Sequence, residues 1–394
     1  MERTGEVMTH SYHLFVGVDI AAATFTATWA ADPTNAPSAR TFAQTPDGFA
    51  AFQHALAATG VAPAATLVVL EATGSYWIAL AVALHQAQYA VSVLNPGQVA
   101  AFARSLPRRS KTDALDAQVL IRFAAERRPP RWTPPEQVYH ELRQRLVVRD
   151  GLLQMRTQAT NQRHALQQWP VQIAGAHDAL ERVIRELNDQ LATLDREIAA
   201  FLRDSAWAAS ATVLLSAPGI GALTAAWLLV STLNFTIAAT PEQLSAYAGL
   251  APMERQSGTS VRGRAAIGHG GNERLRTALY MATLSAARFN PTIAAFYQRL
   301  KAAGKPTKVA RCAAARKLLQ LAYALVRKQQ PYRAPGASLG QEDVVDASPL
   351  RDRDETPAPA PPESRPVARS APKQPTATSR ATACRGLDRA ATLA

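Results

Sequence analysis

Four acidic residues, Asp19, Glu71, Asp113 and Asp116, combine a residue type and a spacing that suit metal-ion chemistry. Asp19 and Glu71 each end an apolar run that is typical of a buried strand. Asp113 and Asp116 lie three residues apart in a helical pattern and therefore share one helix face. Gathered carboxylates repel one another unless cations neutralise them, and Mg²⁺ prefers oxygen ligands and also binds phosphate. The pattern predicts a Mg²⁺ site that activates the attacking oxygen and stabilises the leaving oxygen of a phosphodiester.

Taken one at a time, these acids are not specific. An Asp at a strand end is commonly a cap or turn residue, and an Asp-x-x-Asp pair is commonly part of a solvated helix face. The predicted element order, βββαβα, places all four where they can meet. That joint placement favours the functional interpretation over the structural one.

An α/β domain over residues 14–128 is predicted to position the acids. Its helices are expected to follow Ser75, Asn95 and Thr112. The proline-rich stretch 129–135 ends the domain, because successive prolines remove backbone donors and stop a helix. Five strands are predicted, near residues 14–20, 24–30, 39–45, 66–71 and 91–94.

Residues 129–205 are predicted to form a proline-rich link followed by coiled-coil helices, with a break near Trp169-Pro170 and Gly175. Apolar residues in the second helix alternate spacings of three and four, which is the seam of a coiled coil. Two alternatives are open: the two helices pack on each other within one chain, or they pack on those of a second protomer. The seam consists of Ile184, Leu187, Leu191, Leu194, Ile198 and Phe201.

Residues 206–330 are predicted to be an all-α domain with a helix-hairpin-helix at Pro218-Gly-Ile-Gly221. The free N-terminal amides of the helix after such a turn can hold a phosphate, although the turn is also common as plain structure. No charged residue lies between Asp204 and Glu242, so a membrane span is the alternative. Pro218 and the two glycines divide this apolar stretch into pieces shorter than the ~20 residues that a span needs, so no membrane segment is predicted.

A basic loop is predicted at residues 256–272, because small residues, hydroxyls and arginines are concentrated there, and a helix is expected from Glu273. Residues 254–330 contain fifteen Lys or Arg against two acids, a surplus of thirteen that equals the net charge of the whole chain. Such a segment attracts a polyanion and releases its counterions, so nucleic acid is the predicted partner. A second basic cluster immediately precedes Asp113 and is predicted to contact phosphates: Arg104, Arg108, Arg109 and Lys111.

The ends of the chain are predicted to be unstructured: a flexible N-terminus at 1–13 and a disordered tail at 331–394, which is poor in large apolar residues. The polar start contains no apolar signal-peptide core. Two cysteines, Cys312 and Cys384, are too few for a disulfide framework, so a reducing cytoplasm is the expected setting.

Two sets of motifs over about residues 14 to 330 resemble the DEDD transposases of the insertion-sequence 110 family, kin to Piv-type DNA invertases. In the first half the resemblance lies in Phe15-Val-Gly-Val-Asp-Ile, in Leu-Glu-Ala-Thr-Gly-Ser-Tyr-Trp around Glu71, in Asn95-Pro and in Lys111-Thr-Asp-Ala-Leu-Asp-Ala. In the second half it lies in Pro218-Gly-Ile-Gly221, Ala248-Gly-Leu-Ala-Pro252, Gln256-Ser-Gly258, and Gly271-Asn272 followed by Arg274-Leu-Arg276.

This resemblance implies a bacterial, nucleoid-associated site-specific DNA recombinase that mobilises an insertion sequence. It implies an RNase H-like (RuvC-like) fold for the first domain, with Asp19, Glu71, Asp113 and Asp116 as Mg²⁺ ligands. It makes Ser257 the nucleophile that attaches covalently to DNA, with Ser260 left open as an alternative. The implied partners are the element ends and target DNA, a bridge RNA that pairs with both, and further copies of the chain in a homodimer or tetramer. Arg262, Arg264, Arg274 and Arg276 join the cluster before Asp113 as predicted nucleic-acid-binding residues.

Other functions compete with this interpretation. A RuvC-like structure-selective endonuclease would use the same acids with metal-activated water and form no covalent intermediate. An actin-like ATPase also ends its first strand in Asp, but it needs a phosphate loop next, and Ile-Ala-Ala-Ala-Thr follows Asp19 here. Proofreading exonucleases carry a second acid where this chain has Ala21. In a purely nucleic-acid-binding protein or RNA chaperone the four acids would be dispensable.

Overall fold

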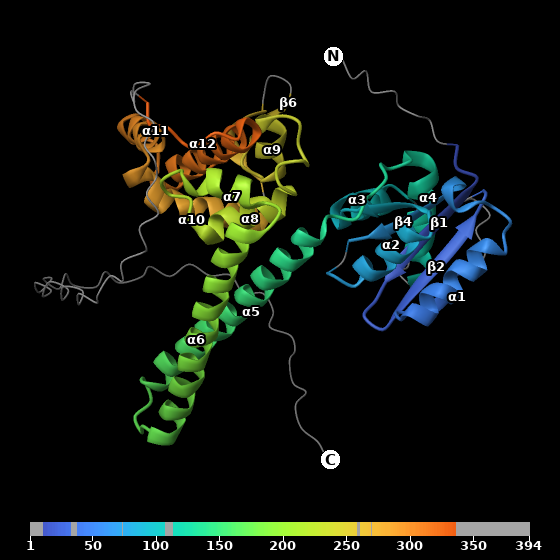
Figure 1. Cartoon of the computed structure of the whole chain (residues 1–394), viewed down its shortest axis with the longest axis horizontal. Helices are drawn as coiled ribbons and strands as arrows, with labels where there is room; N and C mark the ends of the chain where they lie inside the picture. The colour runs from blue at the N-terminus through green and yellow to red at the C-terminus, as the bar shows by residue number, and fades with distance from the viewer. Residues whose placement is uncertain are drawn as a thin grey trace, which may run out of the picture. The chain divides into compact units, whose positions relative to one another are not determined.

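The structure, a computed structural model, describes residues 11–32, 38–72, 74–106, 113–257, 261–268 and 270–335, without the side chains of 113–115, 254–257 and 261–266 (Figure 1). The predictions for the chain ends, at 1–10 and 336–394, therefore lie outside the described residues.

A five-stranded mixed sheet forms the first part of the chain, in the order β3-β2-β1-β4-β5. β1 pairs antiparallel with β2, and β2 with β3, whereas β4 runs parallel to both β1 and β5. Each of the five predicted strands is confirmed to within two residues. Their bounds are β1 Leu14–Ile20, β2 Thr24–Ala30, β3 Arg40–Ala43, β4 Thr66–Glu71 and β5 Ala90–Leu94.

Helices cover both faces of this sheet (Figure 1). α1 (Pro46–Ala57) and α2 (Trp77–Gln86) bury their apolar residues with Val18, Leu70 and other residues of one face. α3 (Pro96–Ser105) and α4 (Asp113–Arg127) bury theirs with Phe15, Val69 and others of the opposite face. The sequence interpretation placed α2, α3 and α4 but not α1.

β1 and α4 touch backbone to backbone at Gly17. A Cβ built on Gly17 would lie 2.1 Å from the Ala117 carbonyl oxygen and 2.6 Å from the Ile121 nitrogen, so only glycine fits. This close contact fixes where α4 crosses the sheet.

Replacing Gly17 by Ala is therefore expected to lower the melting temperature by several degrees, because overpacking of this kind costs ~1–3 kcal/mol. Gly151 is the matched control, since a Cβ there meets nothing within 4 Å. Because Ala favours a helix over Gly by ~1 kcal/mol, Gly151→Ala should leave the melting temperature unchanged or raise it. Equal melting temperatures for Gly17→Ala and the parent chain would refute the tight contact.

The proline-rich link is attached to the sheet rather than free of it. The Trp132 backbone N–H donates to the Val91 carbonyl of β5 at 2.7 Å, and the Trp132 ring packs edge-on against Trp77 at 5.5 Å. Trp132 thus fixes the link to β5 and α2.

Two long helices, α5 (Gln137–Leu166) and α6 (Ala174–Asp204), pack on each other as an antiparallel hairpin. Arg149 forms an ion pair with Asp195, and Arg156 Nη1 donates to Asn188 Oδ1 at 3.2 Å. Leu191, Ile198 and the adjacent Leu202 are buried, while the rest of the predicted seam is partly buried. The structure thus shows the packing within one chain; association with a second protomer stays a prediction.

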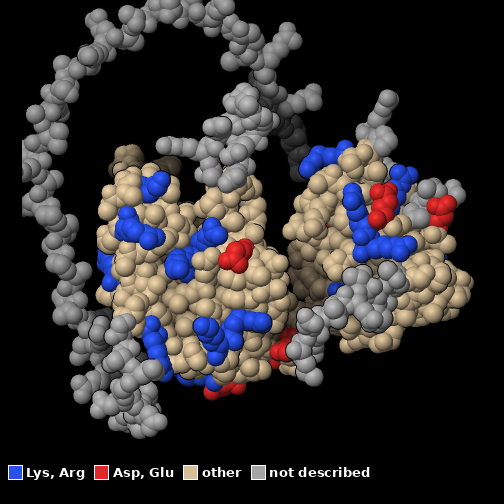
Figure 2. All heavy atoms as spheres, turned by 90° about the horizontal axis from the view of Figure 1, so that it is seen from above, with Lys and Arg blue, Asp and Glu red and all other residues tan. Residues whose placement is uncertain are grey.

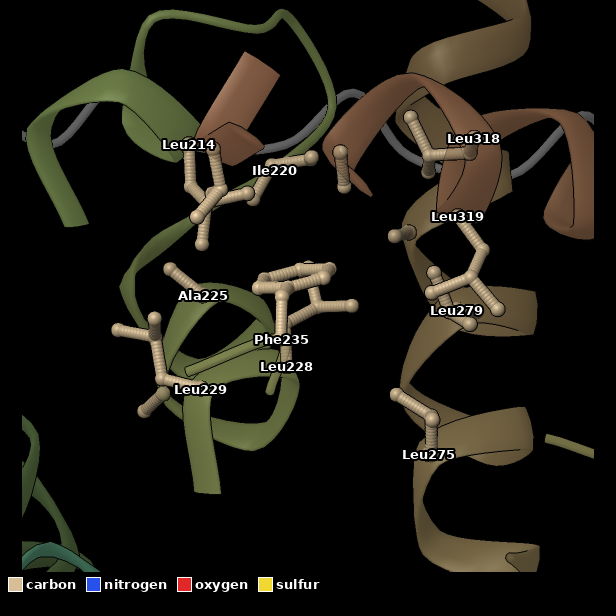
Figure 3. Close-up of a cluster of buried hydrophobic side chains, with 14 of the residues drawn as sticks. Leu214, Ile220, Ala225, Leu228, Leu229, Phe235, Leu275, Leu279, Leu318 and Leu319 are labelled. Atoms are coloured by element: carbon tan, nitrogen blue, oxygen red, sulfur yellow. The ribbon is translucent and has the colours of Figure 1, made fainter. Parts of the chain in front are cut away.

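The remaining helices form a region with one apolar core. Leu214, Phe235, Leu279 and Leu318 come from different segments and point toward one another in that core (Figure 3). The first turns of α5 and the last turns of α6 contribute to it as well. The helices are α7 Ala208–Leu215, α8 Ala222–Thr232, α9 Pro241–Tyr247, α10 Glu273–Phe289, α11 Pro291–Ala302 and α12 Thr307–Lys328.

The prediction that this region is all-α is wrong in one segment. Residues that were expected to form a loop pair instead as a two-stranded antiparallel hairpin, β6 (Pro252–Ser257) and β7 (Val261–Ile267). The turn at Pro218-Gly-Ile-Gly221 does connect two helices, α7 and α8, and Gly219 packs against Ala286 of α10.

Across the described residues no single helix is both long and apolar enough to cross a membrane. Among the helices that the structure describes, the pair α6 and α7 passes that test together, and the chain bends by 112° between them.

Candidate active site

Asp19 and Glu71 lie side by side near the carboxyl ends of two neighbouring interior strands, β1 and β4. Val18 of β1 is paired in parallel with Leu70 of β4, so the next residue on each strand is one of the two acids. Because side chains alternate along a strand, both acids project from the face opposite Val18 and Leu70, which is the face covered by α3 and α4. Both are partly buried. The paired-strand geometry thus brings these two predicted ligands together.

Asp116 belongs to the helix that crosses this same face. It directly precedes Ala117, whose carbonyl oxygen touches Gly17, and Gly17 is two residues before Asp19 on β1. Asp116 is partly buried, and Asp113 is the first residue of α4, one turn earlier. The backbone therefore places Asp19, Glu71 and α4 on the same face of the sheet, near the carboxyl ends of β1 and β4.

Oxygen ligands alone would line such a site, and carboxylates suit a hard divalent cation. Among the residues that the structure describes, no group of three or more His, Cys, Asp or Glu side chains has the geometry of a metal site. The side chain of Asp113 lies outside that description. The complete four-acid site therefore stays a prediction, supported by backbone placement.

Ser257 is the last residue of β6 and pairs with Val261 of β7. The predicted nucleophile thus stands at the end of a paired strand, not in an open loop. Ser260 lies outside the described residues, as do Gly258 and Thr259.

The base of this hairpin is closed by a glycine contact. Gly249 (φ 67°) and Gly271 (φ 91°) both have left-handed backbones, and a Cβ on Gly271 would lie 2.5 Å from the Gly249 nitrogen. Asn272 reinforces the closure, because its N–H donates to the Tyr247 carbonyl at 2.7 Å while its side chain caps α10. Two of the motifs singled out in the sequence therefore hold the ends of the segment that carries Ser257.

The predicted nucleic-acid-binding residues fall into three groups. Arg104 is exposed near the end of α3. Arg274 pairs with Asp150 of α5, and Arg276 Nη1 donates to the Gly270 carbonyl at 2.8 Å, so each has an intramolecular role besides any contact with nucleic acid. Nothing is described for the others, Arg108, Arg109 and Lys111, or for the side chains of Arg262 and Arg264.

Positive charge covers the helical region. α11 and α12 together carry eight Lys or Arg and no acid. Figure 2 shows several Lys and Arg side chains and few Asp or Glu on the visible face of this region. A surface of this kind attracts nucleic acid through its phosphates.

Known proteins match both parts of the chain. A family model described as a transposase of the DEDD IS110 type matches residues 16–168, and the model described as "Transposase IS116/IS110/IS902 family" matches residues 211–298. The pilin gene-inverting protein of Moraxella bovis is 32% identical over 321 residues, which cover 81% of this chain and 97% of that protein. Its counterpart in Moraxella lacunata is 31% identical over the same shares, and an uncharacterised 43.6 kDa protein of the insertion element IS110 from Streptomyces coelicolor is 37% identical over 29% of this chain and 28% of its own length. With two family models in the expected order and a full-length relative above 30% identity, the chain belongs to the IS110 family of transposases and is a DNA recombinase.

Proposed function

We propose that this transposase mobilises an insertion sequence by a metal-dependent reaction in which Ser257 becomes covalently joined to DNA. The observation that carries the proposal is the parallel pairing of β1 and β4, which sets Asp19 beside Glu71 under the helix that bears Asp116. The sheet order, with three antiparallel strands followed by two parallel ones, supports an RNase H-like (RuvC-like) assignment for this part.

In this proposal Asp19, Glu71, Asp113 and Asp116 hold Mg²⁺, in keeping with the divalent-metal dependence that the DEDD family suggests. When bound, the ions activate the nucleophile and stabilise the leaving oxygen at a phosphodiester. The carboxylates would hold the ions where the scissile phosphate binds. The close β1 to α4 contact at Gly17 keeps the ligands of strand and helix in register.

Ser257 supplies the nucleophile. Its Oγ forms a bond to phosphorus, the bond to the leaving strand breaks, and that strand departs with a free hydroxyl. The serine proton would pass to a carboxylate of the predicted four-acid site, acting as general base. One phosphodiester replaces another, so the energy of the bond is kept for rejoining to a new strand. Simple hydrolysis would discard it.

DNA is the substrate, and a bridge RNA that pairs with both donor and target would supply the sequence specificity. The protein then needs to recognise only backbone and shape, which suits a surface rich in Lys and Arg. The turn at Pro218-Gly-Ile-Gly221 would serve as a helix-hairpin-helix, holding a phosphate at the start of α8.

Joining two DNA ends requires more than one active site, so we assign the chain a dimeric or tetrameric state with α5 and α6 as a coiled coil. The connection between these helices exposes three large apolar side chains, Trp169 (65%), Val171 (73%) and Ile173 (68%). Such a cluster is a common mark of a contact surface. The proposed domain division is that of the sequence analysis: 1–13, 14–128, 129–205, 206–330 and 331–394.

The rival function is a RuvC-like structure-selective endonuclease that uses the acids with water. It shares the predicted metal site, so the metal alone does not separate the two. A covalent protein-DNA intermediate does, because water attack forms none.

Chelation of divalent ions is expected to abolish strand cleavage, and Mg²⁺ should restore it. The reason is that uncompensated carboxylates repel both one another and the scissile phosphate. The measurement is cleavage of end-labelled DNA by the intact chain in EDTA, and again after Mg²⁺ or Ca²⁺ is added. DNA binding is measured in parallel by fluorescence anisotropy. Undiminished cleavage in EDTA would remove the metal from the proposal.

A further inference from the structure

A pocket of about 580 Å³ lies beneath the hairpin that carries Ser257. Its walls come from segments far apart in the sequence. Pro252 and Ile267, which face each other at the base of β6 and β7, form one side, and Phe296 of α11 with residues of α12 forms the rest. The volume falls within the range of about 300–1,000 Å³ that is typical of small-ligand sites.

The lining of this pocket combines an aromatic ring with cations. Lys308, Arg316 and Lys317 all reach it from α12, and no acidic residue lines it. Phe296 stands among apolar neighbours, and the Arg299 guanidinium lies 5.3 Å from its ring centroid. An aromatic surface with phosphate-binding groups beside it suits a nucleotide, whose base stacks while its phosphate meets the cations.

One donor in this pocket has no acceptor. Arg316 Nε is buried and makes no hydrogen bond to any part of the chain that the structure describes. A buried donor of this kind costs free energy, and a small shift of the Arg316 side chain toward acceptor oxygens or ring nitrogens in the pocket would relieve that cost.

We propose that this pocket holds a single unpaired nucleotide of the nucleic acid that the transposase binds, with its base against Phe296 and its phosphate on Lys308, Arg316 and Lys317. The inference rests on the proposed binding of nucleic acid by the helical region. Pro252 is five residues before Ser257 on the same strand, a distance of at most roughly 17 Å. This wall of the pocket is therefore near the proposed nucleophile.

Cys312 gives a direct reporter, because it also lines the pocket. Burial raises the pKa of its thiol, partly opposed by Arg276, so labelling rates are compared at one alkaline pH. The test uses the full chain with Cys384→Ser, which leaves Cys312 as the sole thiol. N-ethylmaleimide labelling is timed with duplex DNA or RNA that carries a one-nucleotide bulge, an abasic bulge or no bulge.

The bulged nucleotide is expected to slow labelling of Cys312 by about tenfold, because stacking one base on an aromatic ring stabilises a complex on that scale. The abasic and uninterrupted duplexes are expected to leave the labelling rate unchanged. Whichever of the bulged DNA and the bulged RNA slows labelling more identifies the source of the nucleotide. Bound nucleic acid that leaves the labelling rate unchanged, or equal slowing by all three duplexes, overturns the pocket inference while nucleic-acid binding stands. Absence of any salt-dependent binding would instead defeat the proposed function.

Two variants separate the base from the phosphate. Phe296→Ala should remove the preference for a bulged base over an abasic bulge, and Phe296→Tyr should keep it. Arg316→Gln should lower the slope of log affinity against log salt by about one. Lys328→Gln is the matched control at the end of α12, ~18 Å from Arg316 along the helix axis, and should affect bulged and uninterrupted duplexes alike.

The other occupant to exclude is the chain's own C-terminal segment. A chain that ends at Pro335 should label at the same rate as the full chain in the absence of nucleic acid. Faster labelling of the shortened chain would mean that residues 336–394 fill the pocket, and the nucleotide assignment would then be wrong.

Discussion

Replacing Asp116 by Asn is expected to reduce strand cleavage by two to three orders of magnitude. Loss of one electrostatic contact at a reacting centre acts on this scale. Asn keeps the shape of Asp and removes its charge, so the fold should persist while the metal ions lose a ligand. Asp116 is partly buried on the first turns of α4, next to the contact with Gly17. The expected result is a protein that melts and binds DNA as the parent does but does not cut.

Glu126→Gln is the matched control, because Glu126 is exposed on the same helix ten residues later, ~15 Å along the axis. It should cleave normally. Asp113→Asn is expected to behave as Asp116→Asn does. Full cleavage by both Asp variants would contradict the metal assignment. Loss of cleavage in Glu126→Gln would show that any change of charge on α4 abolishes activity.

Replacing Ser257 by Ala is expected to abolish both the protein-DNA adduct and strand rejoining, because removal of a nucleophile costs several orders of magnitude in rate. The change deletes one hydroxyl at the turn end of β6, away from the hairpin base that Gly249, Gly271 and Asn272 hold closed. Folding should therefore be unaffected. Incubation of end-labelled DNA with the protein and Mg²⁺, followed by denaturing electrophoresis, shows the adduct as label that migrates with protein until protease treatment.

Ser260→Ala serves as the control in the same assay and should form the adduct at the parental level. An adduct that persists in Ser257→Ala would assign the nucleophile to another residue. Parental rejoining without any adduct in wild-type protein would favour a mechanism with no serine intermediate.

Local patterns predicted the sheet well, because β1, β4 and β5 are short, mainly apolar runs and β2 alternates Thr with apolar residues, patterns that do not depend on distant residues. Asp19 and Glu71 could be placed at strand ends for that reason. The parallel pairing that sets them side by side requires β1 and β4 to be neighbours, and only the structure shows this. The contact of Gly17 with α4, a hundred residues later, could not be predicted from local patterns either.

The sequence analysis did not predict α1 or the β6–β7 hairpin, because the sequence pattern of each was overlooked or weak. α1 begins with Thr45 capping Gly48 and Pro46 in the first turn, a recognisable helix start. The β6 and β7 hairpin is rich in Arg, Ser and Gly rather than in apolar alternation, so its composition favoured a loop. What holds it in register is the closure at Gly249 and Gly271, a contact between residues that the sequence keeps apart.

Interactions over long separations also changed the interpretation of the basic residues. Arg274 pairs with Asp150, more than a hundred residues before it, and stands 6.0 Å from the Trp227 ring centroid. A count of charges cannot separate such a residue from Lys308 or Lys317, which line the pocket beneath the hairpin. Charge composition thus predicted the partner class, whereas the position of each contact needed the fold.

The covalent role of Ser257 is tested most directly by mass spectrometry of the trapped intermediate. Trypsin cuts after Arg255 and Arg262, so the peptide Gln256–Arg262 contains Ser257 together with Thr259 and Ser260. After nuclease digestion of the DNA, fragmentation of this peptide locates any attached nucleotide. The mechanism proposed here requires a phosphodiester-linked nucleotide on Ser257. A nucleotide on Thr259 or Ser260, or an unmodified peptide from a reaction in which the DNA has been cut, would contradict it.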